Sequence, residues 1–166
     1  LYADALVVHR LDMATSGLVL FARGTATQRA LSMAFAERRI HKRYEAIVAG
    51  HPGADEGEIN LPLAADWPHR PRQQVCHRTG KPSRTLWQLQ SHDAQSGTSR
   101  LALIPVTGRT HQLRVHLAAV GHPILGDALY ASPPWQTLAP RLLLHATSLS
   151  WDDDVGHRQF SSPPPF

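Results

Sequence analysis

Short apolar runs separated by turn-forming residues mark the first third of the chain. Residues 18 to 22 are all apolar and follow Ser16-Gly17, which predicts a buried strand after a turn. The apolar positions between Ala30 and Phe35 recur at helical spacing, so we predict a helix that Thr25 caps and that runs to about Arg39. Residues 44 to 49 form the next apolar run and predict a second strand.

The middle of the chain lacks this regularity. Residues 51 to 84 are rich in Pro, Gly, His and Arg, so we expect a long, partly irregular excursion with one short strand near residues 59 to 63. Residues 85 to 90 and 100 to 106 then predict two strands of a hairpin, joined by the polar loop 91 to 99.

Helical spacing of the apolar residues returns after Thr107-Gly108. Residues 110 to 120 predict a helix, with Leu113, Leu117 and Val120 on one stripe and Gly121 placed to end it. Residues 142 to 151 predict a last strand, and we expect the segment from there to Phe166 to be a polar tail. Strands outnumber helices in a mixed order without an internal repeat. The pattern therefore predicts an α+β fold with a mixed, largely antiparallel sheet and flanking helices.

Length and composition narrow the class of protein. A chain of 166 residues is suited to one core, so we expect residues 1–166 to be a single catalytic domain that lacks its extreme N-terminal segment. The single cysteine, Cys76, excludes an internal disulfide and favours a reducing compartment. No run approaches the roughly 20 apolar residues of a membrane span. We expect a cytoplasmic protein with no membrane partner.

The positive charge of the chain is almost entirely arginine. The formal net charge is +4, and of the 17 basic residues only Lys42 and Lys81 are lysines. Guanidinium groups suit bidentate contact with phosphate and stacking on bases. Charge alone leaves nucleic-acid binding and a merely basic surface equally open.

Three polar segments carry candidate chemistry. The segment from His9 to Gly17 lies between two apolar runs, where catalytic groups are often held, although Asp12 beside Arg10 is ordinarily a local ion pair or a turn residue. The segment 108 to 116 contains Arg109, His111 and Arg114, which by themselves are two surface cations and a polar histidine. In the third, Lys42-Arg43-Tyr44 leads into a strand, and a tyrosine there is usually a packing residue.

Read together, the segments resemble a known family. His9-Arg10-Leu11-Asp12 followed by Thr15-Ser16-Gly17-Leu18 resembles the signature of the RluA family of pseudouridine synthases, and residues 108 to 116 with 121 to 127 resemble a second block of it. Residues 66 to 76, 79 to 82 and 140 to 146 resemble the RluA subgroup, which acts on ribosomal RNA, on transfer RNA or on both. The resemblance covers nearly the whole chain.

The resemblance implies a role for each candidate residue. It makes Asp12 the nucleophile, Arg114 its ion-pair partner and Tyr44 the platform on which the target base stacks. It also makes Arg10 the wedge that fills the stack vacated by the flipped base, and Lys42 and Arg43 phosphate contacts. We expect Arg109 and His111 to bind RNA as well.

The implied reaction isomerises uridine to pseudouridine in a stem-loop of ribosomal or transfer RNA. No atoms are added, so we expect no cofactor and no metal, and we expect a monomer. Attack at C1' of the ribose, addition to C6 of the base and elimination at C2' remain open as routes. The alternative functions are a non-catalytic RNA-binding or folding factor on the same scaffold and a nucleoside hydrolase. The hydrolase would be expected to carry a phosphate-cradling loop or a metal-binding aspartate cluster.

Overall fold

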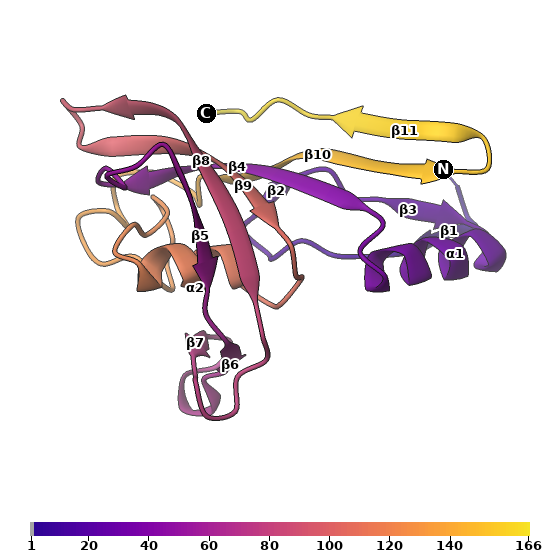
Figure 1. Cartoon of the computed structure of the whole chain (residues 1–166), viewed down its shortest axis with the longest axis horizontal. Coiled ribbons are helices and arrows are strands. Elements are labelled where there is room, and N and C mark those ends of the chain that lie inside the picture. The colour runs from indigo at the N-terminus through magenta and orange to yellow at the C-terminus, as the bar shows by residue number, and fades with distance from the viewer. Residues whose placement is uncertain (1) are drawn as a thin grey trace.

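One seven-stranded sheet forms the framework of the protein in the computed structural model, which describes residues 2–166 (Figure 1). The elements are, in chain order, β1 (Ala5–Val7), β2 (Ser16–Gly17), β3 (Phe21–Arg23), α1 (Thr25–Ala36), β4 (His41–Ala49), β5 (Glu56–Asn60), β6 (Leu63–Ala65), the 3-10 helix η1 (Trp67–His69), β7 (Gln73–Val75), β8 (Arg84–Asp93), β9 (Thr98–Pro105), α2 (Gln112–Ala119), β10 (Leu144–Asp153) and β11 (Gly156–Ser161). This confirms the predicted α+β class.

The sheet is antiparallel except at one place. Its strands lie in the order β11-β10-β4-β9-β8-β5, and β2 adds a short parallel pairing to β10. The predicted hairpin is confirmed as β8 and β9, which are longer than expected and leave only residues 94 to 97 as the turn. The central strands β4 and β9 supply Ala46, Val48, Leu101 and Leu103 to the main core, so one face of the sheet is apolar there.

Both helices cover that apolar face (Figure 1). From α2, Leu113 and Leu117 pack against residues of β4 and β9 such as Val48 and Leu103, all fully or nearly fully buried. From α1, Ala34 packs with Leu149 and Trp151 of β10 in a second cluster. A bulge in β10 between Ala146 and Ser148 lets its apolar residues face both clusters. The predicted helices are thereby confirmed as elements.

Four local predictions were wrong. Thr25 is the first residue of α1, and Gly24 precedes it without a side-chain cap. Of the run 18 to 22, only residues 21 and 22 lie in a strand, β3, which pairs with β1. The expected polar tail contains β11, which pairs with β10 from Ser148 to Asp153.

The predicted irregular excursion is the fourth correction. It contains the edge strand β5 and a two-stranded ribbon of β6 and β7, with η1 at its tip. Strands of three residues are too short to show a period, which explains why the sequence pattern did not reveal them. We call residues 61–82 the arm, because Figure 1 shows the ribbon projecting away from the sheet. Within residues 2–166, no helix is both long and apolar enough to cross a membrane.

Candidate active site

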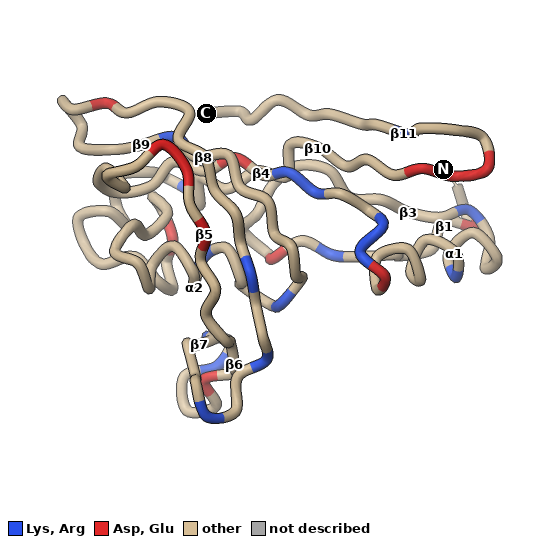
Figure 2. Tube along the Cα trace, in the orientation of Figure 1, with Lys and Arg blue, Asp and Glu red and all other residues tan. Residues whose placement is uncertain are grey.

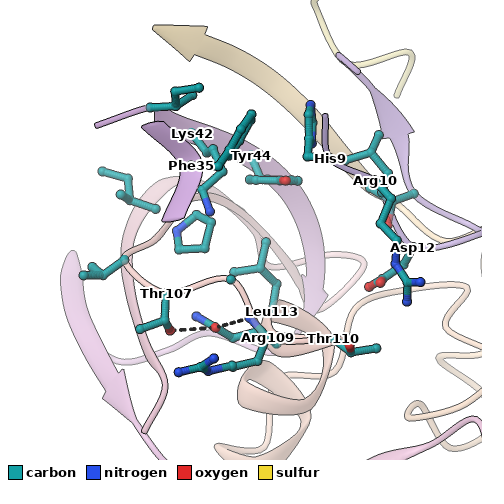
Figure 3. A pocket seen from close by; sticks show the side chains of 18 of the residues that line it. His9, Arg10, Asp12, Phe35, Lys42, Tyr44, Thr107, Arg109, Thr110 and Leu113 are labelled. Carbon is teal, nitrogen blue, oxygen red and sulfur yellow. Dashed lines mark hydrogen bonds between the residues drawn. The ribbon is translucent and has the colours of Figure 1, made fainter. Parts of the chain in front are cut away.

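A cavity of about 700 Å³ opens where the segment after β1, the end of α1, β4 and the loop before α2 meet. Figure 3 shows Arg10 and Asp12 on one side of it, with Lys42 and Tyr44 from β4 and Arg109 from the loop before α2 on the others. Among the described residues that line it, Asp12 is the only acid, whereas Arg10, Arg38, Lys42 and Arg109 are basic. Its size falls in the roughly 300–1,000 Å³ range of ligand pockets.

The segment that carries Asp12 is tied to the sheet through β10. Ser16 and Gly17 pair with His145 and Ala146, and the Oγ of Ser16 lies 2.8 Å from Nδ1 of His145. Gly17 has a φ of +112°, and a Cβ there would lie 2.3 Å from the carbonyl oxygen of Ala146. Only glycine therefore allows the close approach that fixes this segment against the sheet.

His9 holds the other end of the segment. The backbone N–H of Leu20 donates to its Nε2 over 2.9 Å, and its ring lies 4.5 Å from that of Phe35 on α1. Burial lowers the pKa of His9, and the charge of Lys42 lowers it further. A neutral ring is what an accepting Nε2 requires. Between the two anchors, the N–H of Thr15 donates to the carbonyl of Asp12 over 2.9 Å and closes a turn.

Strand β4 brings two polar side chains to the cavity. Lys42 and Tyr44 are two residues apart on one strand and both line it. Burial raises the pKa of Tyr44 to about 12, and the nearby carboxylate of Asp12 adds to the rise. Burial also lowers the pKa of Lys42, with a further contribution from the charge of Arg38. Tyr44 is thus a neutral hydroxyl close to the carboxylate of Asp12.

The direct ion-pair partner of Arg114 in this structure is Asp127 and not the predicted Asp12. Nε and Nη2 of Arg114 bond to the carboxylate of Asp127 at 2.8 and 2.6 Å, and among residues 2–166 no ion pair joins Arg114 to Asp12. Burial opposes the charge of this guanidinium, but the bond and the charge of Asp127 outweigh it and raise the pKa of Arg114, with a further contribution from Asp12. Arg114 is therefore a buried cation close to Asp12 whose direct partner is Asp127.

His111 does not line the cavity, contrary to the expectation of an RNA contact. It caps α2 in the left-handed conformation, it is buried, and its Nδ1 lies 2.7 Å from the hydroxyl of Tyr130. Burial lowers the pKa of His111, although the charge of Asp12 acts in the opposite direction. The ring of Tyr130 lies 5.1 Å from the guanidinium of Arg114. Tyr130 thus joins His111 and Arg114 behind the cavity wall.

Arg43 also lies apart from the cavity. It alternates with Lys42 and Tyr44 along β4 and is exposed, because neighbouring residues of a strand point to opposite faces. The structure therefore gathers Arg10, Asp12, Lys42, Tyr44 and Arg109 at the cavity, and leaves Arg43, His111 and Arg114 outside its lining.

Sequence reasoning missed three residues that shape the site. Asp127 and Tyr130 form the layer around Arg114, and Gln112 orders the loop before α2. The side-chain oxygen of Gln112 accepts from the hydroxyl of Thr107 over 2.7 Å and from the N–H of Arg109 over 3.0 Å. Gly126-Asp127 after an apolar run was a visible turn signal. That Arg114 is the partner of Asp127 could be identified only from the fold.

Comparison with known proteins identifies the family. Residues 2–119 match the family described as RNA pseudouridylate synthase, and this match spans the segment of Asp12, strand β4 and the helix of Arg114. The chain belongs to this family.

Its relatives place this pseudouridine synthase among those of the RluA type. The dual-specificity RNA pseudouridine synthase RluA of Escherichia coli strain K12 is 53% identical over 149 residues, which are 90% of this chain and 68% of that protein. The protein of the same name from Yersinia pestis is 50% identical over 162 residues, 98% of this chain and 76% of that one. The chain is accordingly an isomerase that acts on RNA.

A solved structure agrees with the fold of this pseudouridine synthase. Human RNA pseudouridylate synthase domain containing 1 superposes with a TM-score of 0.88 at 31% identity, covering 98% of this chain and 70% of that one. Both kinds of comparison confirm the family that the sequence motifs resemble.

The buried ion pair yields a stability prediction for the synthase. Replacing Asp127 with Ala should lower the free energy of unfolding by about 3–5 kcal/mol, because it leaves the Arg114 guanidinium buried without its partner. Urea unfolding followed by circular dichroism measures the change. As a matched control, Asp4→Ala removes an exposed carboxylate 3.2 Å from Arg23 and should change stability by less than about 1 kcal/mol. Equal, small losses in the two variants would contradict the prediction.

Tyr44 yields a prediction about alkaline pH. Its pKa is about 12 in the folded chain against 10.0 for the free side chain, so above pH 10 the unfolded state loses a proton that the folded state keeps. This stability is fully present below pH 10 and is lost toward pH 12. Urea unfolding should show the wild type losing about 1.4 kcal/mol per pH unit more than Tyr44→Phe in this window. Identical slopes would show that Tyr44 titrates normally.

Proposed function

We propose that this chain isomerises uridines in structured loops of both ribosomal and transfer RNA, with Asp12 as the nucleophile. The observation that carries the proposal is that Asp12 is the single carboxylate among the described residues lining a basic cavity and has Tyr44 beside it. The dual-specificity names of the bacterial relatives support the two RNA classes. A polyanion is attracted by the cavity's cations, and the reaction requires one ionised carboxylate within it.

Arg114 and Tyr44 have distinct proposed roles around that carboxylate. Arg114 places a positive charge near Asp12, and the charge of Asp12 contributes to the raised pKa of Arg114, while Asp127 holds the guanidinium in place. Tyr44 supplies a rigid ring against which the uracil stacks, and its raised pKa keeps its hydroxyl neutral near Asp12.

The RNA contacts follow the location of the basic residues. Arg10, Lys42 and Arg109 line the cavity and are proposed to hold the flipped nucleotide, with Arg10 filling the vacated stack. Arg43, on the other face of β4, is proposed to contact phosphates outside the cavity. The buried His111 contributes by positioning the loop before α2 through its bond to Tyr130.

The chemistry needs no other reactant. The bond from N1 to C1' breaks, the base turns, a bond forms from C5 to C1', and the proton of C5 leaves while N1 gains one. Each of the three routes uses the same ionised carboxylate facing the ribose and the base. We further propose that the chain acts as one catalytic domain, as a monomer and in the cytoplasm.

Asp12→Asn should lower the single-turnover rate by at least about 10⁴-fold, because the amide cannot act as the nucleophile. RNA affinity should stay nearly unchanged, since the cations that attract the RNA remain. Tritium release from C5-labelled uridine in an anticodon-arm stem-loop measures the rate, and Asp4→Asn is the control. A normal rate in the Asp12 variant would exclude the nucleophile assignment and favour a non-catalytic role for this residue.

The two RNA classes can be tested directly. Purified protein incubated separately with unmodified transfer RNA and ribosomal RNA transcripts should produce pseudouridine in both, at loop positions, as read by mass spectrometry of nuclease fragments. Asp12→Asn should produce none in either. Product in only one class would reduce the proposal to single specificity, and product in neither would refute it.

A further inference from the structure

One buried hydroxyl in the segment that carries Asp12 has no partner. Among residues 2–166, Oγ1 of Thr15 is the only buried side-chain nitrogen or oxygen atom that makes no hydrogen bond. The hydroxyl of the next residue differs, because Oγ of Ser16 lies 2.8 Å from Nδ1 of His145. Nearly all buried polar groups of folded proteins are paired, since an unpaired group loses its hydration without replacement. An exception so close to the nucleophile is therefore a candidate for function.

Thr15 and Asp12 lie at the two ends of one tight turn. The N–H of Thr15 donates to the carbonyl of Asp12 over 2.9 Å, and Met13 and Ala14 form the exposed tip between them. In a turn closed by such a bond, the Cα atoms of the first and last residues are within about 7 Å of each other. Both end residues also line the cavity. The hydroxyl of Thr15 and the carboxylate of Asp12 are thus carried side by side.

The carboxylate of Asp12 has an unused capacity to accept hydrogen bonds. Figure 2 shows Lys and Arg concentrated on the chain that leads from α1 into β4, and Arg38 and Lys42 of this stretch line the cavity. Despite these cations, no ion pair among the described residues involves Asp12, and Arg114 bonds to Asp127 instead. An unpaired donor and an unpaired acceptor therefore lie at opposite ends of the same turn.

Burial determines which acceptor the Thr15 hydroxyl can reach. Because this hydroxyl is buried, an atom of the substrate could touch it only after the wall of the cavity moved. The carboxylate of Asp12 needs only to rotate about its side-chain bonds, since His9 and Gly17 hold the backbone of the segment at both ends. The acceptor that requires the smaller movement is thus the nucleophile itself.

We propose that Thr15 is a positioning residue, whose hydroxyl donates to one carboxylate oxygen of Asp12 when the flipped nucleotide enters the cavity. The bond directs the other oxygen toward the ribose and the base and limits rotation of the side chain. The free protein keeps this donor unpaired at a cost in stability, as strained groups at active sites often are. This inference rests on the proposed function, because Thr15 acts only through Asp12 as the nucleophile.

The test uses two substitutions of Thr15 and two matched controls. Thr15→Val keeps the shape of the side chain and removes the hydroxyl, whereas Thr15→Ser keeps the hydroxyl. Thr85→Val is the control for stability, because the buried hydroxyl of Thr85 has a partner, Nδ1 of His116 at 2.9 Å. Thr98→Val is the control for the rate, because Thr98 is buried, bonds to Ser96 over 2.8 Å and lies outside the cavity lining.

The two stability shifts should have opposite signs. Thr15→Val should raise the urea midpoint of unfolding, because it removes a buried hydroxyl that has no partner. Thr85→Val should lower the midpoint, because it removes a partner of His116. A lower midpoint for Thr15→Val would overturn the proposal, since the hydroxyl would then stabilise the free protein.

The rate should move against the stability. Thr15→Val should lower the single-turnover rate on an anticodon-arm stem-loop at saturating RNA by roughly 10- to 150-fold, the effect of one hydrogen bond to a charged group. Its dissociation constant for the stem-loop should stay unchanged, Thr15→Ser should regain most of the rate, and Thr98→Val should match the wild type. A merely structural role for Thr15 would not combine a slower reaction with a more stable protein.

The pH dependence of the rate tests whether Thr15 acts through Asp12. A hydrogen bond to an ionised carboxylate favours that form, so the acid limb of the profile should lie at higher pH in Thr15→Val than in Thr15→Ser or the wild type. Neither substitution changes the other charged or titratable groups near Asp12, which are Arg10 on its own segment, Tyr44 on β4, and His111 and Arg114 at α2. An unmoved acid limb would overturn the proposal.

The remaining outcomes separate this proposal from the one on which it rests. A wild-type rate in Thr15→Val, or no recovery in Thr15→Ser, would overturn the role of the hydroxyl. Weaker RNA binding by Thr15→Val that Thr15→Ser restores would also overturn it, because the hydroxyl would then contact the RNA. A normal rate in Asp12→Asn would count against the proposed function. An active wild type with an inactive Asp12→Asn and unaffected Thr15 variants would count against the positioning role alone.

Discussion

The buried guanidinium of Arg114 is the constraint around which the site is organised. A charge that is only 5% exposed is stable only when its hydrogen bonds are met, and Asp127 meets two of them from a turn outside α2. The same carboxylate accepts from the N–H groups of Leu129 and Tyr130, so it also shapes that turn. Tyr130 in turn contacts His111 and the arm. One ion pair thus joins α2, the turn after it and the arm into a single layer under the cavity.

The fold could be predicted where a hydrophobic period survives in the sequence. The hairpin of β8 and β9 and the helix α2 each bury one face, so their apolar residues reveal them. Strand β11 could not be found this way, because almost all of its residues are exposed and it is held by backbone pairing to β10. The run 18 to 22 led to a wrong strand prediction because its residues are apolar without all being in a strand. Leu18 and Leu20 pack against the second core cluster but lie outside β3.

The site could be predicted as a set of residues more reliably than as a set of contacts. Asp12, Arg109 and the pair Lys42 and Tyr44 come from three separate motifs and meet at one cavity, which a resemblance between motifs can anticipate. The partner of Arg114 depended on where the chain returns after α2, and no local pattern encodes that return. Arg43 shows the same limit in a simpler form, because its place on β4 opposite to the cavity follows from the register of the strand.

The lone carboxylate in the basic cavity favours a catalytic role for the site over RNA binding alone. Asp12 opposes the binding of a phosphate-rich ligand, and a domain that only bound RNA would be better served by a neutral residue there. The segment that carries Asp12 is nevertheless held at both ends. Gly17 packs closely against β10 at one end, and His9 accepts a backbone hydrogen bond at the other. Tyr44 is kept neutral beside it, so the hydroxyl adds no second negative charge. The arrangement therefore weakens binding at one point to keep a nucleophile in place, which is the compromise that catalysis requires.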